Sequence, residues 1–254
     1  MTKTPASFAV FIASVFVFVP ARSDAATDSL KNPFQGFYGQ VASGYEANFF
    51  NDTTTRYTNI FPDSTFSSGT NRAGSQRSSG IPLVVGVGYY FSVSDKWMLG
   101  IGADFSFLPH TTNAFSARNP EFISAVPATG QQIKTSNRFN LFLTPGYVLT
   151  QQDLLYAKIG YTNQQIQFSR PPQDSTTGYS LDSRQGGYVL GLGYRKILDK
   201  GLYFYAEVNY LKYSNQSLSG STITNTGDDI VVTRIEQNPA SSAFTGLIGL
   251  GYRF

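Results

Sequence analysis

The feature that most constrains this chain is a series of segments of about ten residues in which apolar and polar side chains alternate. Alternation with a period of two indicates a β-strand whose two faces meet different surroundings. In one segment, Leu99 and Ile101 lie on one face, whereas Gly100 and Gly102 lie on the other. Eight such strands are predicted, at 36–49, 81–92, 97–107, 139–149, 155–162, 188–195, 202–210 and 244–254.

The connections between these strands alternate between short and long. Three are turns of a few residues, whereas the other four are rich in Ser, Thr, Asn and Gly and cover 51–80, 109–137, 164–183 and 214–241. Several long loops are uncommon in a soluble domain, but outer-membrane barrels have short periplasmic turns and long extracellular loops. The sequence therefore predicts an all-β fold, an eight-stranded antiparallel up-and-down transmembrane β-barrel.

A ten-stranded barrel is the alternative topology, with the fourth long connection crossing the membrane as a hairpin. It is less favourable because that hairpin would carry several charges into lipid, namely Asp228, Asp229, Arg234 and Glu236. We expect instead that this hairpin, with Thr226-Gly227 at its turn, extends the strands above the membrane.

The apolar face has two candidate surroundings, the lipid or a second β-layer in a soluble sandwich. The distribution of aromatic side chains favours lipid, because outer-membrane barrels have an aromatic girdle at each membrane interface. The predicted girdle beside the short turns contains Phe91, Trp97, Tyr147, Tyr194 and Tyr252, and the one toward the long loops contains Phe49, Phe107, Phe139, Tyr161, Tyr188, Tyr210 and Phe244.

Composition excludes several other classes. The chain has no Cys, which argues against a disulfide scaffold or a cysteine-based zinc module. A net charge of +3 spread over 254 residues does not predict nucleic-acid binding. Gly-x-Gly pairs such as Gly86 and Gly88 lie within strands, whereas a phosphate-binding loop joins a strand to a helix. Small residues on the polar face are instead suited to a narrow barrel interior.

The N-terminus has the layout of a secretory signal peptide. Lys3 precedes a mainly apolar run over 8–19, and Pro20 and small residues such as Ala25 follow. The run is too short for a transmembrane helix, which needs about 20 residues, so an uncleaved anchor is the weaker interpretation. We expect a signal peptide over 1–26, a periplasmic N-terminal segment over 27–34 and a barrel domain over 35–254.

The C-terminus carries the most specific motif, with Ile248, Leu250, Tyr252 and Phe254 on the lipid-facing side. This ending resembles the terminal signature of bacterial outer-membrane β-barrels, and the whole pattern is similar to the small outer-membrane-protein-A, outer-membrane-protein-X and opacity-protein families. The resemblance implies an integral protein of a Gram-negative outer membrane. It also implies contact with outer-membrane lipid and lipopolysaccharide, and recognition by the barrel-assembly machinery during biogenesis.

Charged residues on the inward face predict a polar network inside the barrel. They are Glu46, Asp104, Lys158, Arg195, Glu207 and Arg253. Because an enclosed charge must be paired, we expect a network centred on Lys158, Arg195 and Glu207, with the other two acids nearer the long loops. The preferred interpretation is a static plug that sets the strand register; the alternative is a narrow, gated ion or solute channel.

Catalysis is not expected, because the chain lacks an evident nucleophile, base and acid in one place. The only histidine, His110, is followed by Thr112, whereas lipid A deacylases use a His-x-Ser arrangement. We therefore expect His110 to be a rim residue, and we expect no enzymatic activity, metal or cofactor. A lipid A-modifying enzyme remains the remote alternative.

The predicted function is a structural or surface-interaction role through the extracellular loops, such as adhesion or contact with a host or surface ligand. The loops contain aromatic and arginine side chains that suit a binding surface, namely Tyr57, Phe61, Arg72, Arg77, Phe115, Arg118, Phe122, Arg170, Tyr179 and Arg234.

Overall fold

The computed structural model describes residues 32–121, 128–172, 178–226 and 229–254. The predicted signal peptide and residues 27–31 lie outside the described residues. The strands are β1 (Gly36–Phe50), β2 (Thr53–Ile60), β3 (Phe66–Ala73), β4 (Gln76–Gly80), β5 (Leu83–Ser92), β6 (Trp97–Ser106), β7 (His110–Thr111), β8 (Phe115–Ala117), β9 (Ala128–Val148), β10 (Asp153–Arg170), β11 (Tyr179–Asp199), β12 (Leu202–Tyr213), β13 (Leu218–Thr226), β14 (Asp229–Gln237) and β15 (Ser241–Arg253).

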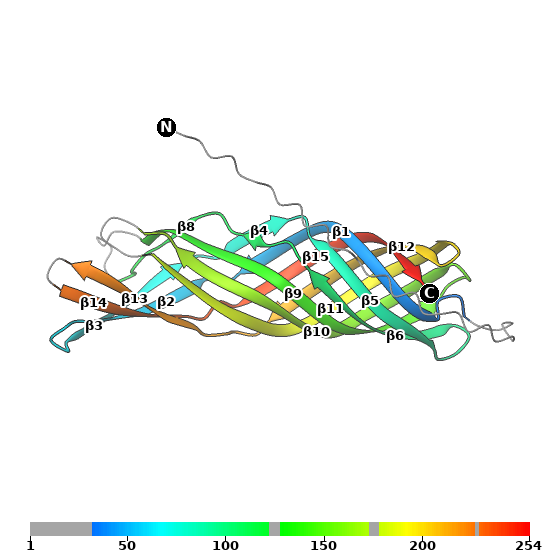
Figure 1. Cartoon of the computed structure of the whole chain (residues 1–254), viewed down its shortest axis with the longest axis horizontal. Helices are drawn as coiled ribbons and strands as arrows, with labels where there is room; N and C mark the ends of the chain where they lie inside the picture. The colour runs from blue at the N-terminus through cyan, green and yellow to red at the C-terminus, as the bar shows by residue number, and fades with distance from the viewer. Residues whose placement is uncertain (1–31, 122–127, 173–177, 227–228) are drawn as a thin grey trace, which may run out of the picture. The chain divides into compact units, whose positions relative to one another are not determined.

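Eight of these strands form a closed antiparallel ring in the order β1, β5, β6, β9, β10, β11, β12 and β15 (Figure 1). The pairing of β9 with β10 completes the circle. Each ring strand pairs with the ring strand that follows it in the sequence. The predicted eight-stranded up-and-down barrel is therefore confirmed. The ten-stranded alternative is wrong, because β13 and β14 belong to a separate four-stranded sheet, β13-β14-β2-β3.

The turns at one end of the ring are short, as predicted. Lys200 and Gly201 connect β11 to β12, and both have positive φ values, 42° and 92°. Such a two-residue turn matches the twist of the flanking antiparallel strands. At the β5–β6 turn, the backbone N–H of Val93 donates to the carbonyl of Trp97 at 2.9 Å.

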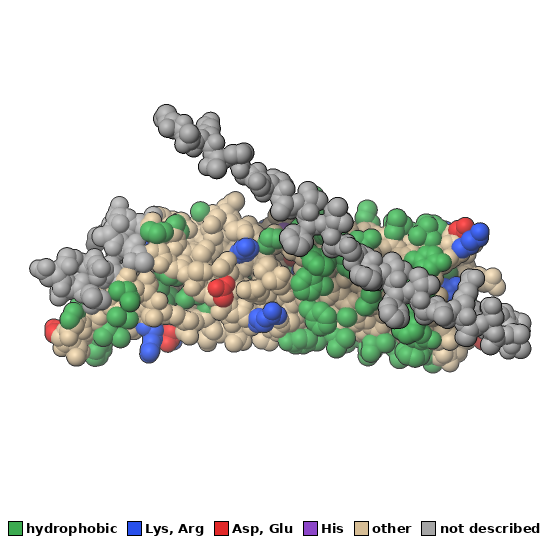
Figure 2. Space-filling model, in the orientation of Figure 1, with side chains coloured by type: hydrophobic (Ala, Val, Ile, Leu, Met, Phe, Trp, Pro, Cys, Tyr) green, Lys and Arg blue, Asp and Glu red, His purple; other side chains and the backbone are tan. Residues whose placement is uncertain are grey.

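A belt of exposed apolar side chains surrounds the turn-proximal half of the ring. On β9, Leu141 and Leu143 are about half exposed, and the intervening Phe142 is buried. From Trp97 to Phe107 the chain spans about 33 Å when extended, which is roughly 25 Å along the membrane normal at a strand tilt of about 40°. Figure 2 shows the hydrophobic side chains gathered over this half, with mainly polar surface beyond it. Within the described part of the chain, no helix is long and apolar enough to cross a bilayer.

The four long connections contain more strand than the sequence predicted. Those segments extend the barrel strands or add the strands β2, β3, β4, β7, β8, β13 and β14. β9 has 21 residues and begins at Ala128, well before the predicted start at Phe139. The hairpin expected in the fourth connection is confirmed, since Thr226 of β13 pairs with Asp229 of β14.

The sequence did not predict these added strands because the face that carries the apolar residues changes above the belt. In the lower part of β10, Leu155 and Ile159 point outward toward lipid, and Lys158 points inward. Farther up the same strand, Ile166 and Phe168 point inward. They join a buried cluster of Phe50, Ala73, Phe115, Ala117, Ile133, Ile166, Phe168, Leu181, Leu218 and Ile235. The outer surface meets water at this level, so the apolar residues lie on the inward face of the strands.

This upper part, which we call the extracellular extension, consists of the upper ends of β9–β11 together with β2–β4, β7, β8, β13 and β14. Burial there raises the pKa of Tyr179 to about 12, so its hydroxyl remains neutral. Phe115 and Tyr179, which were expected to be exposed on loops, pack instead in or against the apolar cluster. Phe122 lies outside the described residues.

The lower end of the ring is closed by residues that precede β1. Phe34, in the segment expected to be periplasmic, is buried with Tyr38 and Tyr90 in a lower interior cluster. The amide nitrogen of Gln35 donates to the carbonyl of Asn32 at 2.9 Å, which turns the chain beneath the barrel. Phe34, just before β1, therefore forms part of the interior packing.

We predict that Leu141→Arg lowers the free energy of unfolding by about 2–4 kcal/mol, since the arginine would lie in the middle of the lipid-facing belt. The matched control is Ile223→Arg on β13, where a similarly exposed apolar residue lies on the extension. This control substitution should change the free energy of unfolding by no more than about 0.5 kcal/mol. Urea unfolding in liposomes, followed by Trp97 fluorescence, measures both, and equal costs would contradict the assignment of the belt to lipid.

Candidate functional site

The interior of the ring holds a balanced set of buried charges. Among the described residues, the buried acids are Glu46, Asp104 and Glu207, and the buried lysine and arginines are Arg138, Lys158 and Arg195. Three negative groups therefore face three positive ones. This balance is required because an unpaired charge in an enclosed interior is strongly destabilising.

Lys158 lies at the centre of the middle group. Its Nζ atom is 2.7 Å from Asp104 Oδ2 and 2.9 Å from Glu207 Oε1. Its ammonium also lies 4.0 Å from the centroid of the Phe142 ring. The two acids are held in turn by neighbours, because Asn140 Nδ2 donates to Asp104 at 2.5 Å and the Tyr156 hydroxyl donates to Glu207 at 2.9 Å.

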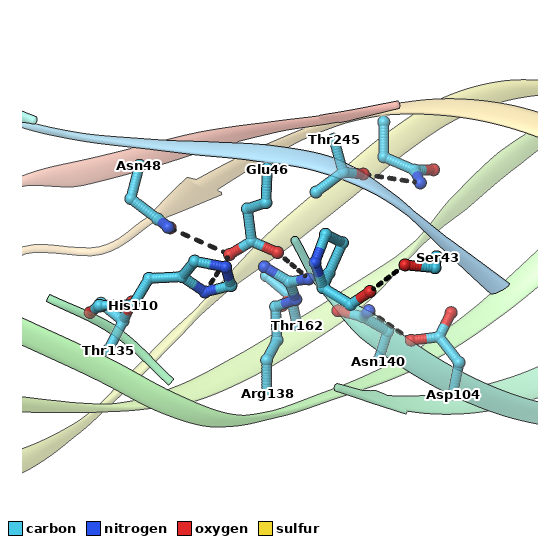
Figure 3. A network of polar contacts seen from close by, with 12 residues as sticks. Ser43, Glu46, Asn48, Asp104, His110, Thr135, Arg138, Asn140, Thr162 and Thr245 are labelled. Carbon is cyan, nitrogen blue, oxygen red and sulfur yellow. Dashed lines mark hydrogen bonds and ion pairs between the residues drawn. The ribbon is translucent and has the colours of Figure 1, made fainter. Parts of the chain in front are cut away.

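The upper group surrounds Glu46. Arg138 Nη2 lies 2.6 Å from Glu46 Oε2, Asn48 Nδ2 donates to Oε1 at 3.0 Å, and His110 Nδ1 lies 3.6 Å from the same oxygen. Figure 3 shows Glu46 between the Arg138 and His110 side chains, which approach it from β9 and β7. The carboxylate thus connects β1 to β9 and to β7, which pairs with β9.

The lower group is an aromatic cage around Arg195. Its guanidinium carbon lies 4.1 Å from the centroid of Tyr203 and 4.4 Å from that of Tyr38. Tyr90 and Tyr156 also surround it, at 4.9 Å and 5.9 Å. Arg195 Nη2 donates to Gln40 Oε1 at 3.0 Å. Cation–π contacts with several rings stabilise such a cation where no carboxylate lies within 4.0 Å among the described residues.

The structure separates some residues that the sequence placed together. Lys158 and Glu207 are in contact, but Arg195 occupies its own cage. Asp104, which was expected nearer the long loops, binds Lys158 directly. Counting residues from the turns misplaces heights because the strands of a small barrel are tilted and staggered. Arg253 lies at the lower end, where its Nη1 donates to the carbonyl of Gln35 at 3.1 Å.

Sequence reasoning missed Arg138, because the strand was expected to begin at Phe139. A usable signal was present, since Arg138 shares its face with Asn140 and Thr144. His110 was expected at the rim, but it is buried beside Glu46. β9, which continues above the belt, carries Arg138 inside the barrel, and β7, which pairs with β9, carries His110.

The interior contains very little free space. Two cavities of about 10 Å³ flank Arg138, one lined by Asp104, Asn140, Lys158 and Asn209, and the other by Glu46, Ser106, His110 and Gln164. Each is large enough for about one water molecule. Above them, the apolar cluster fills the extension.

A larger pocket lies on the extension, and we call it the extension pocket. It has a volume of about 310 Å³ and is lined by Arg56, Tyr57, Thr58, Ser68, Gly69, Thr70, Glu121, Arg234 and Glu236. Arg56 and Glu236 face each other across paired strands, and so do Thr58 and Arg234. Within the described part of the chain, none of its four charged side chains has an ion pair within 4.0 Å.

The aromatic residues predicted for the girdles lie on the outer surface. Trp97 and Tyr147 contact each other beside the short turns, with their ring centroids 5.1 Å apart. Phe91, Tyr194 and the C-terminal Tyr252 and Phe254 lie at the same end of the strands, and Ile248 and Leu250 face outward above them. The girdle members toward the extension are Phe49, Phe107, Phe139, Tyr161, Tyr188, Tyr210 and Phe244, which are all exposed.

The surroundings of His110 bear on the question of catalysis. His110 has Glu46 as its acidic neighbour, but no serine or threonine hydroxyl forms a hydrogen bond with its ring there. No group of three His, Asp or Glu side chains suitable for a metal is found in the described ranges. The described interior therefore has the features of a packed polar core.

A closed antiparallel ring with an apolar exterior and paired interior charges defines an integral β-barrel protein of the bacterial outer membrane. No protein-family model and no curated protein sequence matches the chain. Similar solved structures include OprG from Pseudomonas aeruginosa, with 15% identity over 87% of this chain and 97% of that one and a TM-score of 0.49. The outer-membrane protease OmpT from Escherichia coli has 11% identity over 90% and 100%, with a TM-score of 0.48.

The attachment invasion locus protein Ail from Yersinia pestis also matches, with 13% identity over 87% of this chain and 99% of that one and a TM-score of 0.36. All three are bacterial outer-membrane proteins. Because the identities and TM-scores are low, the assignment to the outer membrane rests on the barrel's own surface and interior.

Replacing Lys158 with Met is expected to lower the free energy of unfolding by about 3–5 kcal/mol, because Asp104 and Glu207 would remain buried without their cation. Combining it with Asp104→Asn and Glu207→Gln should restore most of that loss. The control is Lys196→Met, which removes an exposed pair with Asp153 and should cost less than about 1 kcal/mol. Denaturant titrations of the four proteins would refute the paired-charge account if the triple variant were the least stable.

In planar bilayers, the purified protein should show no steady conductance in the nanosiemens range, because its interior is filled by side chains. A general porin inserted by the same protocol provides the positive control. Steady open-channel currents from the heat-modifiable, folded protein would favour the channel alternative over the plug.

Proposed function

We propose that this protein is a non-enzymatic surface-contact protein whose extracellular extension binds a partner outside the cell. The single observation that carries the proposal is that the strands continue above the lipid belt as a packed body with its own apolar core. Such a core is not needed to cross the membrane. A body of this kind holds a binding surface at a defined distance from the membrane.

The extension is built to hold its surface rigidly. β2 and β3 come from the first long connection and β13 and β14 from the fourth, and they combine in one sheet through the pairing of β2 with β14. Gln237 Nε2 donates to the Thr55 hydroxyl at 2.5 Å beneath this sheet. A preformed surface loses little conformational entropy on binding, and this supports a role in recognition.

The lining of the extension pocket suits a hydrophilic ligand, and we infer that this ligand is a surface glycan. Its lining combines two arginines, two glutamates, several hydroxyl groups and the ring of Tyr57. Its volume lies within the range of small-molecule sites. Hydroxyl-rich ligands need many donors and acceptors in one place, and Arg56 and Glu236 supply both kinds side by side.

The interior network is proposed to act as a structural plug. Each group connects strands far apart in the sequence, as Lys158 does by joining β6 and β12 through Asp104 and Glu207. Satisfied polar networks of this kind favour one strand register over shifted ones. This role agrees with the small cavity volumes and supplies no ion path.

The proposal is tested by presenting the protein in lipid nanodiscs to a printed glycan array. We expect the native protein to bind a subset of glycans, and the double variant Arg56→Ala/Arg234→Ala to lose at least about tenfold in affinity for them. Arg118→Ala is the matched control, because Arg118 is exposed on the same extension outside the pocket.

Binding that survives in the double variant would contradict the pocket as the contact site, and failure to bind any glycan would contradict the ligand class. Removing one hairpin is not a suitable test, because it would leave its partner in the four-stranded sheet unpaired. A deletion should therefore remove the β2–β3 and β13–β14 hairpins together.

A further inference from the structure

We propose that the extension pocket is selective for zwitterionic sugars, in which an amino group and a carboxylate are carried on neighbouring ring carbons. This inference rests on the proposed function, because it names the class of glycan that the same pocket holds. Three observations support it: the balance of charge in the lining, the absence of ion pairs among the charged side chains that the structure describes there, and the spacing that the strand register gives them.

The lining of the pocket carries two positive and two negative side chains. Arg56 and Arg234 line it together with Glu121 and Glu236, and all four are exposed to solvent. Because these charges cancel, the lining gives no long-range attraction to a polyanion or a polycation. A ligand with one sign of charge would also lie beside two side chains of the same sign. A ligand that carries both signs can contact all four favourably.

The four charged side chains are not paired with one another. Among the described residues, no nitrogen of Arg56 or Arg234 lies within 4.0 Å of a carboxylate oxygen. This separation is notable because Glu236 is directly opposite Arg56 in the pairing of β2 with β14. Exposed ion pairs stabilise a protein only weakly, so keeping these groups apart costs little. A ligand therefore reaches them without first breaking an internal ion pair.

The register gives three of these charges a spacing that suits a single sugar ring. The residues beside them on the strands, Thr55 and Ile235, are buried, so Arg56, Arg234 and Glu236 project from the same outer face. Side chains directly opposite each other on antiparallel strands have Cβ atoms about 5 Å apart, and diagonal neighbours about 7–8 Å. Groups on neighbouring carbons of a sugar ring are similarly close. One ring can therefore present its carboxylate to arginine and its amine to glutamate at the same time.

The second acid, Glu121, comes from a separate segment that is tied to β2. Asn119 Nδ2 donates to the Tyr57 hydroxyl at 3.3 Å, and the backbone N–H of Glu121 donates to Asn119 Oδ1 at 2.8 Å. Tyr57 follows Arg56 on β2, so these bonds connect the segment that bears Glu121 to the strand that bears an arginine. The charges of the lining are thus assembled before a ligand arrives, which reduces the entropy lost on binding.

The hydroxyl groups of the lining favour a sugar over a free amino acid, which has the same two charges. Thr58, Ser68 and Thr70 line the pocket beside the charged residues. Thr58 is opposite Ser68, and Thr70 is opposite Arg56 in the pairing of β2 with β3. Each hydroxyl can donate one hydrogen bond and accept others. The ring hydroxyls of a sugar provide partners for these groups, whereas a simple amino acid such as alanine provides none.

Four forms of one amino sugar test this proposal on the full-length protein in lipid nanodiscs. The methyl glycoside of muramic acid carries an amine and a carboxylate on substituents of neighbouring ring carbons. N-acetylation removes its positive charge, methyl esterification removes its negative charge, and both changes together give a neutral sugar. Dissociation constants are measured by NMR titration. We expect the zwitterion to bind at least about tenfold more tightly than either singly modified form.

Two double variants should separate the two preferences. Arg56→Gln/Arg234→Gln should abolish the loss caused by esterification and keep the loss caused by acetylation, whereas Glu121→Gln/Glu236→Gln should do the converse. The controls are Arg118→Gln and Asp182→Asn, which remove exposed charges of the extension outside the pocket. Both controls should keep both preferences. Circular dichroism and heat-modifiable migration would establish that all four variants are folded.

Three outcomes would overturn the proposal. In the first, the neutral or a singly modified form binds as tightly as the zwitterion. In the second, alanine at the same concentration displaces the sugar, which would indicate a site for amino acids. In the third, no form binds, although the array identifies a glycan whose binding depends on Arg56 and Arg234. Each of these results leaves the proposed function standing, whereas an array without any bound glycan contradicts the proposed ligand class itself.

Discussion

The requirement that every backbone N–H and C=O group in hydrocarbon be satisfied within the protein determines most of this structure. Strands can meet it only by closing into a ring, and the pairing of β9 with β10 provides that closure. A ring of this size has an interior just wide enough for side chains. The charges inside it must therefore pair with one another, as Lys158 does with Asp104 and Glu207. Closure, narrowness and charge balance are consequences of the same constraint.

Each long strand passes from lipid into water. The polarity of its inward and outward faces changes at that level. Along β10, Ile159 faces lipid while Lys158 is enclosed, but farther out Phe168 is enclosed and Gln167 faces outward. The interior therefore changes from polar to apolar at the level where the exterior changes from lipid to water. This reversal converts segments that appear to be loops into an extension with a core of its own. It also closes the barrel above the charged groups.

The outer surface of the extension then offers a polar pocket. The extension pocket presents arginines and glutamates together, which suits a hydrophilic ligand away from the membrane. Recognition at the surface is the role that we propose for it.

The sequence by itself determined the fold class, the eight ring strands, the short turns and the lipid-facing aromatic residues, because alternation with a period of two is a local property. It also identified most of the buried charges, since Glu46, Asp104 and Glu207 lie on the inward side of recognisable strands. Only the tertiary structure decided which charges meet, because tilt and stagger set the height of each residue across the ring. Only the tertiary structure also revealed Arg138 and the extension. Where the surroundings change from lipid to water, the apolar residues move from the outward positions of a strand to the inward ones, and the alternation from which strands are predicted is interrupted.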